Sequence, residues 1–168
     1  MKRHIFYPCA VLLLIGLCSA CMHHQNKSRN TEVEDIILAE DISIQLDSFM
    51  RKRSFRSIIV FRLKDDDCSE CKRFFTDLYL AAKKKTDQVV LLSRLPGYRS
   101  VLVFKEMSGI NDSVINMNRP IAKMDQSLNP YVFIYNGNKT VNCFVPLKTD
   151  RLYNEQKIDS MINYVNNY

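Results

Sequence analysis

The feature that most constrains this fold is a pair of cysteines at the point where an apolar strand gives way to a helix. The segment Ser57 to Leu63 (SIIVFRL) is rich in β-branched residues and nearly all apolar, which is typical of a strand buried on both faces of a sheet. From Cys68 to Lys85 the apolar residues recur at helical spacing. An acidic turn joins the two segments, and Asp67 is placed to cap the helix. We therefore expect Cys68 and Cys71 on the first turn of a helix that starts where a buried strand ends.

The remaining segments predict a chain in which helices and strands alternate. We expect a helix over residues 32–50, a basic linker over 51–56, a strand over 88–95, a helix over 98–107, a short strand over 114–117 and a C-terminal helix over 151–166. By composition residues 98–107 fit a helix or a strand, and we favour the helix because a parallel neighbouring strand requires a crossover of that length. A hairpin over 131–135 and 140–145 is expected to use Asn136-Gly137, the preferred two-residue turn.

Apolar spacing also predicts which faces of these elements are buried. The first helix is expected to bury Val33, Ile36, Ile37, Ile44, Leu46 and Phe49. The last helix is expected to bury Leu152, Ile158, Met161, Ile162 and Val165. In the second hairpin strand, alternation places Val141, Cys143 and Val145 on one face. We therefore expect Cys143 to be a buried small hydrophobe with no part in catalysis.

The first twenty residues have the pattern of an export signal. Lys2 and Arg3 precede the apolar run Val11 to Leu17, and the small pair Ser19-Ala20 precedes Cys21. A helix that spans a bilayer needs about 20 apolar residues, so we favour a signal over a membrane-spanning anchor. A cysteine straight after the small pair resembles a bacterial lipoprotein signal. That resemblance implies that Cys21 is lipidated, and a plainly secreted protein is the alternative.

These features divide the chain into a lipoprotein signal peptide over residues 1–20, a polar tether over 21–31 and one domain over 32–168. With 46% apolar and 25% charged residues, the chain can build one core and remain soluble. Loss of two cations with the signal lowers the formal charge from +6 to +4, which is too small to imply a nucleic-acid partner. The mature chain keeps Cys21, Cys68, Cys71 and Cys143, and export to an oxidising compartment permits a disulfide among them.

The order of elements and two motifs resemble the thioredoxin superfamily over nearly the whole mature chain. The first motif is C-S-E-C, Cys68 to Cys71, in its strand-to-helix context. The second is Pro130 in NPYVFIYNGN, which resembles the cis-proline that opens the hairpin in that superfamily. The resemblance implies an α/β fold, a thioredoxin-like three-layer sandwich with a central mixed sheet and helices on both faces. It also implies that the backbone of Asn129 pairs with the substrate chain as a short added strand.

A C-x-x-C pair at the start of a helix has the chemistry of thiol-disulfide exchange. The unpaired N–H groups and the dipole of the helix favour a thiolate at Cys68. Cys71 lies three residues on, so Cys68 would attack a substrate disulfide and Cys71 would resolve the mixed disulfide. The chain departs from the superfamily pattern at Asp67, where a tryptophan is usual, and at Arg62, where many members bury an aspartate.

Two functions from different classes follow. The first is a lipid-anchored thiol-disulfide oxidoreductase of the cell envelope, a reductase or isomerase that needs no cofactor. It would act on exported cysteine-containing proteins and be recharged by a membrane electron donor. Because the acids Asp65 to Asp67 and Glu70 oppose the helix dipole, we expect the pair to donate electrons.

The second function is a redox-inactive thioredoxin-like lipoprotein that acts as an interaction module. A static disulfide on the same scaffold would serve it. We expect no metal site, because zinc would need two further ligands beside the cysteine pair. The mature chain offers only His23 and His24, which lie on the tether, and Cys143. The sequence D-D-D-C before the helix also differs from the T-x-x-C pattern of peroxiredoxin-like sites.

Overall fold

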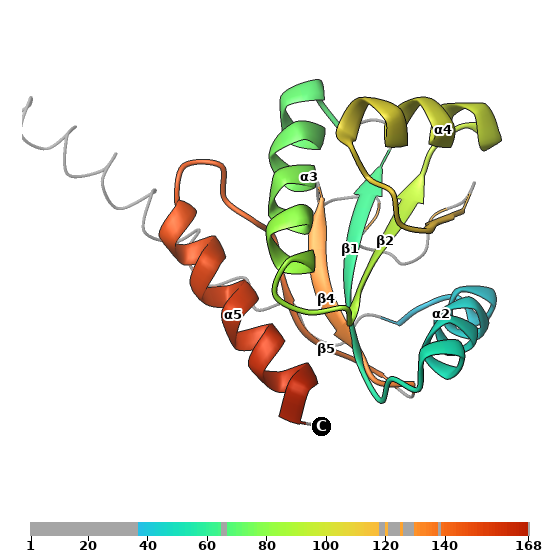
Figure 1. Ribbon diagram of the computed structural model, residues 1–168, viewed down its shortest axis with the longest axis vertical. Coiled ribbons are helices and arrows are strands. Elements are labelled where there is room, and N and C mark those ends of the chain that lie inside the picture. Colours follow the sequence, from blue (N-terminus) through green and yellow to red (C-terminus); the bar gives the residue numbers. More distant parts are fainter. Residues whose placement is uncertain are drawn as a thin grey trace, which may run out of the picture. The chain divides into compact units, whose positions relative to one another are not determined.

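The computed structural model describes residues 37–64, 67–117, 120, 125, 130–137 and 139–167. Along the chain the elements are α2 (Glu40–Arg53), β1 (Ile58–Lys64), α3 (Ser69–Lys83), β2 (Val89–Arg94), α4 (Gly97–Ser108), β3 (Val114–Asn116), β4 (Tyr131–Tyr135), β5 (Thr140–Phe144) and α5 (Arg151–Asn167) (Figure 1). The predicted order is confirmed from α2 onward, including the helix at 97–108. The predicted signal peptide 1–20 and tether 21–31 lie outside the described residues.

The strands form a mixed five-stranded sheet in the order β3-β2-β1-β4-β5. Strands β1, β2 and β3 are parallel, whereas β4 runs antiparallel to both β1 and β5. β1 lies at the centre, and all seven of its residues are buried, as its apolar composition predicts. The connections β1-α3-β2 and β2-α4-β3 cross the sheet in the same direction, so right-handed crossovers place α3 and α4 on one face.

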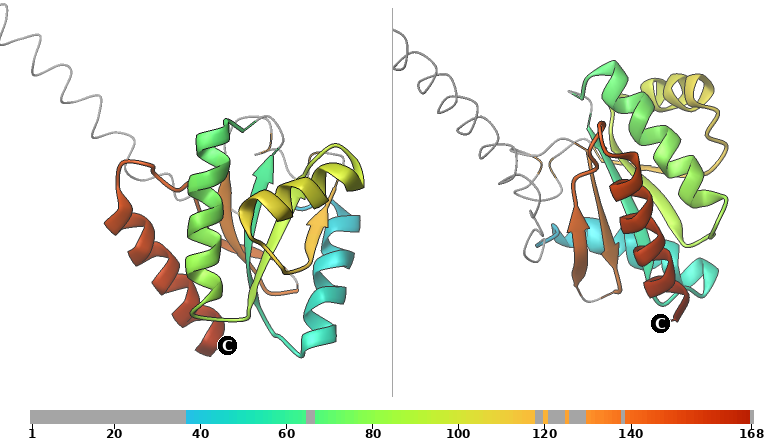
Figure 2. Two further views of the ribbon diagram at one scale, coloured as in Figure 1. Left: turned by 45° about the horizontal axis from the view of Figure 1, so that its top comes forward. Right: turned by 90° about the vertical axis from the view of Figure 1, so that its left-hand side faces the viewer.

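Helices cover both faces of the sheet, and β1 sends alternate side chains into two apolar cores. The α3 core contains Ile59 and Phe61 of β1 together with residues of α3 and α5, which lie side by side in Figures 1 and 2. Phe104 of α4 packs against this core. The α2 core, on the other face, contains Ile58 and Val60. The predicted three-layer α/β sandwich is therefore confirmed.

Helix α2 differs from its prediction in both bounds and buried face. It begins at Glu40 and includes Arg51–Arg53, which the sequence assigned to a linker. Basic residues in a last turn interact favourably with the helix dipole, and Ser54 ends the helix in the left-handed region at φ 58°. Ile37 and Ile44, predicted to be buried, are 87% and 57% exposed. The buried residues follow a spacing of four and are Ile42, Leu46 and Met50.

Helix α5 has the predicted bounds within a residue, but one member of its predicted buried face is wrong. Leu152 is exposed, and Asn154 is buried instead. The Asn154 amide donates to the Leu147 carbonyl at 2.6 Å, and its oxygen accepts from the Leu147 N–H at 2.9 Å. A buried amide is stable only with such partners, so Asn154 fixes the backbone of the loop between β5 and α5.

The β4-β5 hairpin has the predicted strand bounds to within a residue but is less regular than predicted. Four residues, Asn136 to Lys139, separate the strands, and the Asn136 N–H donates to the Lys139 carbonyl at 3.3 Å. Val132 pairs with Phe144 and Ile134 with Val141, so β5 contains one extra residue, and Asn142 has φ 53°. This β-bulge reverses the alternation of faces. Val141 packs against the α3 core and Cys143 lies in the α2 core, which corrects the prediction that both share one face.

A buried ion pair lies on the α2 face of the central strand. The side chains of Arg62 and Asp125 are both fully buried, and Arg62 Nη2 donates to Asp125 Oδ2 at 2.7 Å. Arg62 Nη1 also donates to the carbonyl of Leu63. The Tyr131 hydroxyl donates to Asp125 Oδ1 at 2.8 Å, and the Lys64 ammonium donates to the Asp125 carbonyl. Burial and the Asp125 carboxylate raise the pKa of Tyr131 above its usual range, so its hydroxyl remains a donor.

We predict that Arg62→Met lowers the free energy of unfolding by about 3–5 kcal/mol, because removal of one partner leaves a buried carboxylate uncompensated. Denaturant titration of the variant measures this loss. Arg151→Met, which removes a guanidinium that is 90% exposed, is the matched control and should change stability by no more than about 0.5 kcal/mol. Adding Asp125→Leu to Arg62→Met should restore part of the loss. Equal stability of Arg62→Met and wild type would show that the pair is not needed for folding.

Candidate functional site

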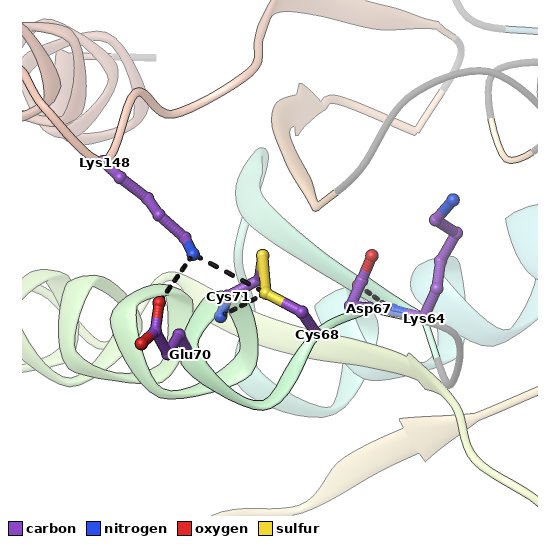
Figure 3. The surroundings of a disulfide bond; sticks show 6 residues. All are labelled: Lys64, Asp67, Cys68, Glu70, Cys71 and Lys148. Atoms are coloured by element: carbon purple, nitrogen blue, oxygen red, sulfur yellow. Dashed lines mark hydrogen bonds and ion pairs between the residues drawn. A yellow bond between two sulfur atoms is a disulfide. The ribbon is translucent and has the colours of Figure 1, made fainter.

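The cysteine pair forms a disulfide at the start of α3. The Cα atoms of Cys68 and Cys71 are 5.0 Å apart. Cys68 is the N-cap residue, and its Sγ accepts a hydrogen bond from the Cys71 N–H at 3.1 Å (Figure 3). Cys68 is exposed and Cys71 is half-buried. Cys68 is therefore the more accessible of the two sulfurs, and the roles of attacking and resolving cysteine stay predictions.

Asp67 does not cap α3, contrary to the prediction. Its Oδ2 accepts from the Lys64 N–H at 2.8 Å, so the carboxylate points back toward the end of β1 (Figure 3). Asp67 is buried. Cys68 is instead the N-cap residue, so the Cys71 N–H at the start of the helix donates to sulfur and not to a carboxylate. Asp65 and Asp66, also predicted to oppose the dipole, lie outside the described residues.

A lysine that the sequence analysis missed lies directly beside the cysteine pair. The Lys148 Nζ is 3.5 Å from Cys68 Sγ and 3.5 Å from Glu70 Oε2, as Figure 3 shows. Lys148 follows Leu147, whose backbone is held by the buried amide of Asn154. The base of the lysine is thus fixed, although its side chain is 42% exposed.

Sheet topology explains why residues so distant in sequence meet here. β5 is antiparallel to β4, which is antiparallel to β1, so β1 and β5 end at the same edge of the sheet. The loops after both strands, with Cys68 and Lys148, therefore approach each other. The sequence could have indicated that Lys148 lies near Cys68 only if the pairing of β1 with β4 and of β4 with β5 had also been predicted.

The charges at the pair act in opposite directions. An ammonium near Cys68 favours its thiolate, as does the positive end of α3. Glu70 disfavours the thiolate, but its carboxylate is paired with Lys148, which reduces its effect. The arrangement therefore supports a nucleophilic Cys68 in the reduced protein, with the Lys148 ammonium in contact with its sulfur.

Pro130 lies at the same sheet edge. It is buried and directly precedes β4, and the pairing of Tyr131 with Arg62 places it opposite the end of β1. Asn129 lies outside the described residues. The predicted cis peptide bond between Asn129 and Pro130, and the predicted pairing of Asn129 with substrate, therefore stay predictions.

Cys143 is a free thiol in the α2 core. Burial raises its pKa to about 12, so at neutral pH the group is a protonated thiol and a poor nucleophile. It lies on the opposite face of the sheet from the α3 core. These properties make it a control residue for experiments on the cysteine pair.

The described part of the chain has neither of two other kinds of site. Among these residues no group of three or more His, Cys, Asp or Glu side chains is placed to hold a metal ion. Within the same residues no helix combines the length and the apolarity needed to cross a bilayer.

We predict that Lys148→Met slows alkylation of Cys68 in the reduced protein about two- to fivefold at pH 7, the range expected for a partly exposed charge near a thiolate. Glu70→Gln should accelerate the reaction by a similar factor. Peptide mass mapping after timed alkylation follows Cys68 alone, and Lys84→Met at the far end of α3 is the control. The effect should disappear in about 1 M salt, where charges are screened within a few ångströms. An unchanged rate in both variants would exclude an electrostatic role for this ion pair.

Comparison with known proteins concerns the fold. No family model matches this chain, and no curated protein matches it. Among solved structures, a Chlorobium tepidum protein named as thiol:disulfide interchange protein DsbE matches with a TM-score of 0.51 and 15% identity, over 67% of this chain and 84% of that chain. A Bacteroides thetaiotaomicron protein named as a protein disulfide isomerase has a TM-score of 0.40 and 17% identity, over 65% of this chain and 72% of that chain. With its mixed sheet and its C-x-x-C pair at the start of α3, the chain has a thioredoxin-like fold.

Proposed function

We propose that this protein is a lipid-anchored thiol-disulfide oxidoreductase of the cell envelope, working as a reductase or isomerase. The observation that supports it best is the site itself. An exposed Cys68 sulfur caps a helix, lies within bonding distance of Cys71 and is contacted by the ammonium of Lys148. A purely structural disulfide needs neither the exposure of its first cysteine nor a cation beside it.

The proposed reaction transfers two electrons from the reduced pair to a substrate disulfide. The Cys68 thiolate attacks one substrate sulfur, forming a mixed disulfide and releasing the other substrate sulfur as a thiolate, which takes up a proton. The Cys71 thiol then loses its proton and attacks Cys68 Sγ, which releases the second substrate thiolate. The products are a reduced substrate and the Cys68–Cys71 disulfide. A membrane dithiol donor would reduce this disulfide for the next cycle.

The direction of transfer depends on how strongly the thiolate is stabilised. Glu70 and the acidic run before the helix oppose the dipole, whereas Lys148 adds to it. We propose that these effects nearly cancel, so that the pair has a potential nearer the roughly −270 mV of thioredoxin than the roughly −120 mV of a strongly oxidising relative with a very acidic cysteine. Such a pair would pass electrons to exported cysteine-containing proteins.

We predict that the reduced wild-type protein reduces a protein disulfide and that Cys68→Ser abolishes this activity. Cys71→Ser should accumulate a mixed disulfide with substrate, because its resolving thiol is absent. Cys143→Ala is the matched control, and its rate should stay within about tenfold of wild type, a barrier change below roughly 1.4 kcal/mol. The rates are measured with the mature chain in detergent, and equilibration with glutathione gives the potential. A potential above about −150 mV would make the protein an oxidant, and absence of turnover would favour the redox-inactive interaction module.

We predict that Cys21 carries the lipid and that the wild type therefore partitions with membranes. Cys21→Ser should not mature to the same species, because the acylated residue is missing. Metabolic labelling with a fatty acid, followed by fractionation, compares the two chains. A wild-type chain that incorporates no label at Cys21 would refute the anchor while leaving the redox proposal untouched.

A further inference from the structure

A groove between α3 and α4 is not used by the disulfide chemistry. Its volume is about 740 Å³, and it is lined by the first half of α3 and by most of α4. The groove starts at Ser69, the residue after Cys68. On α4 its lining extends from Arg99 to Ser108, roughly 13 Å along the helix axis at 1.5 Å per residue. An extended peptide of about four residues has that length.

One wall of the groove is apolar and exposed. Helix α4 buries only Val101, whereas Val103 and Met107, which line the groove, are 47% and 84% exposed. Tyr98 and Leu102 of the same helix are also exposed. Exposed apolar side chains that line a groove, here Val103 and Met107, are typical of a site that binds another molecule, because their burial is favourable by about 25 cal/mol per Å².

The lining of the groove carries an excess of positive charge. Lys72 and Arg73 of α3 and Arg99 of α4 line it, with Asp77 as the acid among the lining residues. Within the described residues, Arg73 and Arg99 form no ion pair or side-chain hydrogen bond. Three cations against one acid next to an apolar surface favour a ligand that combines negative charge with apolar groups.

We propose that this groove binds the stretch of substrate polypeptide next to the reactive cysteine, and that it selects stretches with acidic and apolar side chains. The inference rests on the proposed function, because the groove begins one residue from the attacking Cys68. Its length suits a few residues of extended chain. Acidic side chains would pair with Arg73 and Arg99, and an apolar side chain would pack on Val103 and Met107. Substrate specificity would then depend on the groove next to the cysteine pair and not on the two cysteines.

The test separates binding from redox turnover. Two peptides of the same length are compared, each with one Leu and with a Ser in place of the cysteine, one flanked by Glu and the other by Lys. Their affinities for the oxidised full chain in detergent are measured by fluorescence anisotropy at low and high salt. We expect the Glu peptide to bind about tenfold more tightly at low salt, from two partly screened ion pairs. The double variant Arg73→Gln/Arg99→Gln should lose most of this preference.

Matched variants make the assignment specific. Lys84→Gln, which removes a charge from α3 away from the groove, should retain the preference, and Met107→Ser should weaken the binding of both peptides. Equal affinities for the Glu and Lys peptides, or a preference that persists in the double arginine variant, would overturn the proposal. So would loss of binding to anionic vesicles in that variant without any change in peptide binding, because the groove would then bind a membrane surface.

The same Glu and Lys peptides are also made with the cysteine retained and linked to a small thiol as a mixed disulfide. The rate at which the reduced protein reduces each of them is then measured. The Glu peptide should be reduced faster than the Lys peptide, while the uncharged small disulfide 4,4′-dithiodipyridine should react equally with wild type and the double variant. If dithiodipyridine is not reduced, the proposed redox function fails. The binding preference would still decide the role of the groove, because it is measured without turnover.

Discussion

The fold depends on how it accommodates a guanidinium in the centre of its sheet. Arg62 belongs to the middle strand and is fully buried, so its charge must be compensated inside the protein. Asp125 supplies the carboxylate, Tyr131 of β4 donates to that carboxylate, and the Leu92 carbonyl of β2 accepts from Arg62. One buried charge therefore links three neighbouring strands to the segment that leads toward Pro130. The ion pair lies two residues before the end of β1, the strand that leads to the cysteine pair.

At that end of the sheet, side chains of the candidate site come from parts of the chain that are distant in sequence. The turn after β1 provides the cysteine pair, the residue before β4 is Pro130, and the loop after β5 provides Lys148. Parallel and antiparallel pairing brings these three ends together. Asn154, on yet another element, holds the loop of Lys148 in place. The surroundings of Cys68 therefore depend on groups that long-range packing puts in place.

The sequence predicts the elements whose physical signal is local. The β-branched run of β1 and the helical spacing of α3 correctly indicated a buried strand followed by a helix that carries the cysteines. The sequence did not predict features for which two hydrogen-bond partners or two strand registers compete. Asp67 is a good N-cap by type, yet its carboxylate binds the Lys64 N–H, and the bulge at Asn142 reverses the faces of β5. Lys148 carries no local signal at all, because its role arises from a contact 80 residues away.

The bulge at Asn142 also bears on how this protein avoids unwanted association. β5 is an edge strand of the sheet, and unpaired edges can recruit strands from other chains. A left-handed residue in the middle of β5 interrupts the regular extended backbone of this strand and increases its twist. The opposite edge, β3, is only three residues long. A protein proposed to act on exported polypeptides would thereby have, among its described strands, no long regular edge strand that could serve as a template for aggregation.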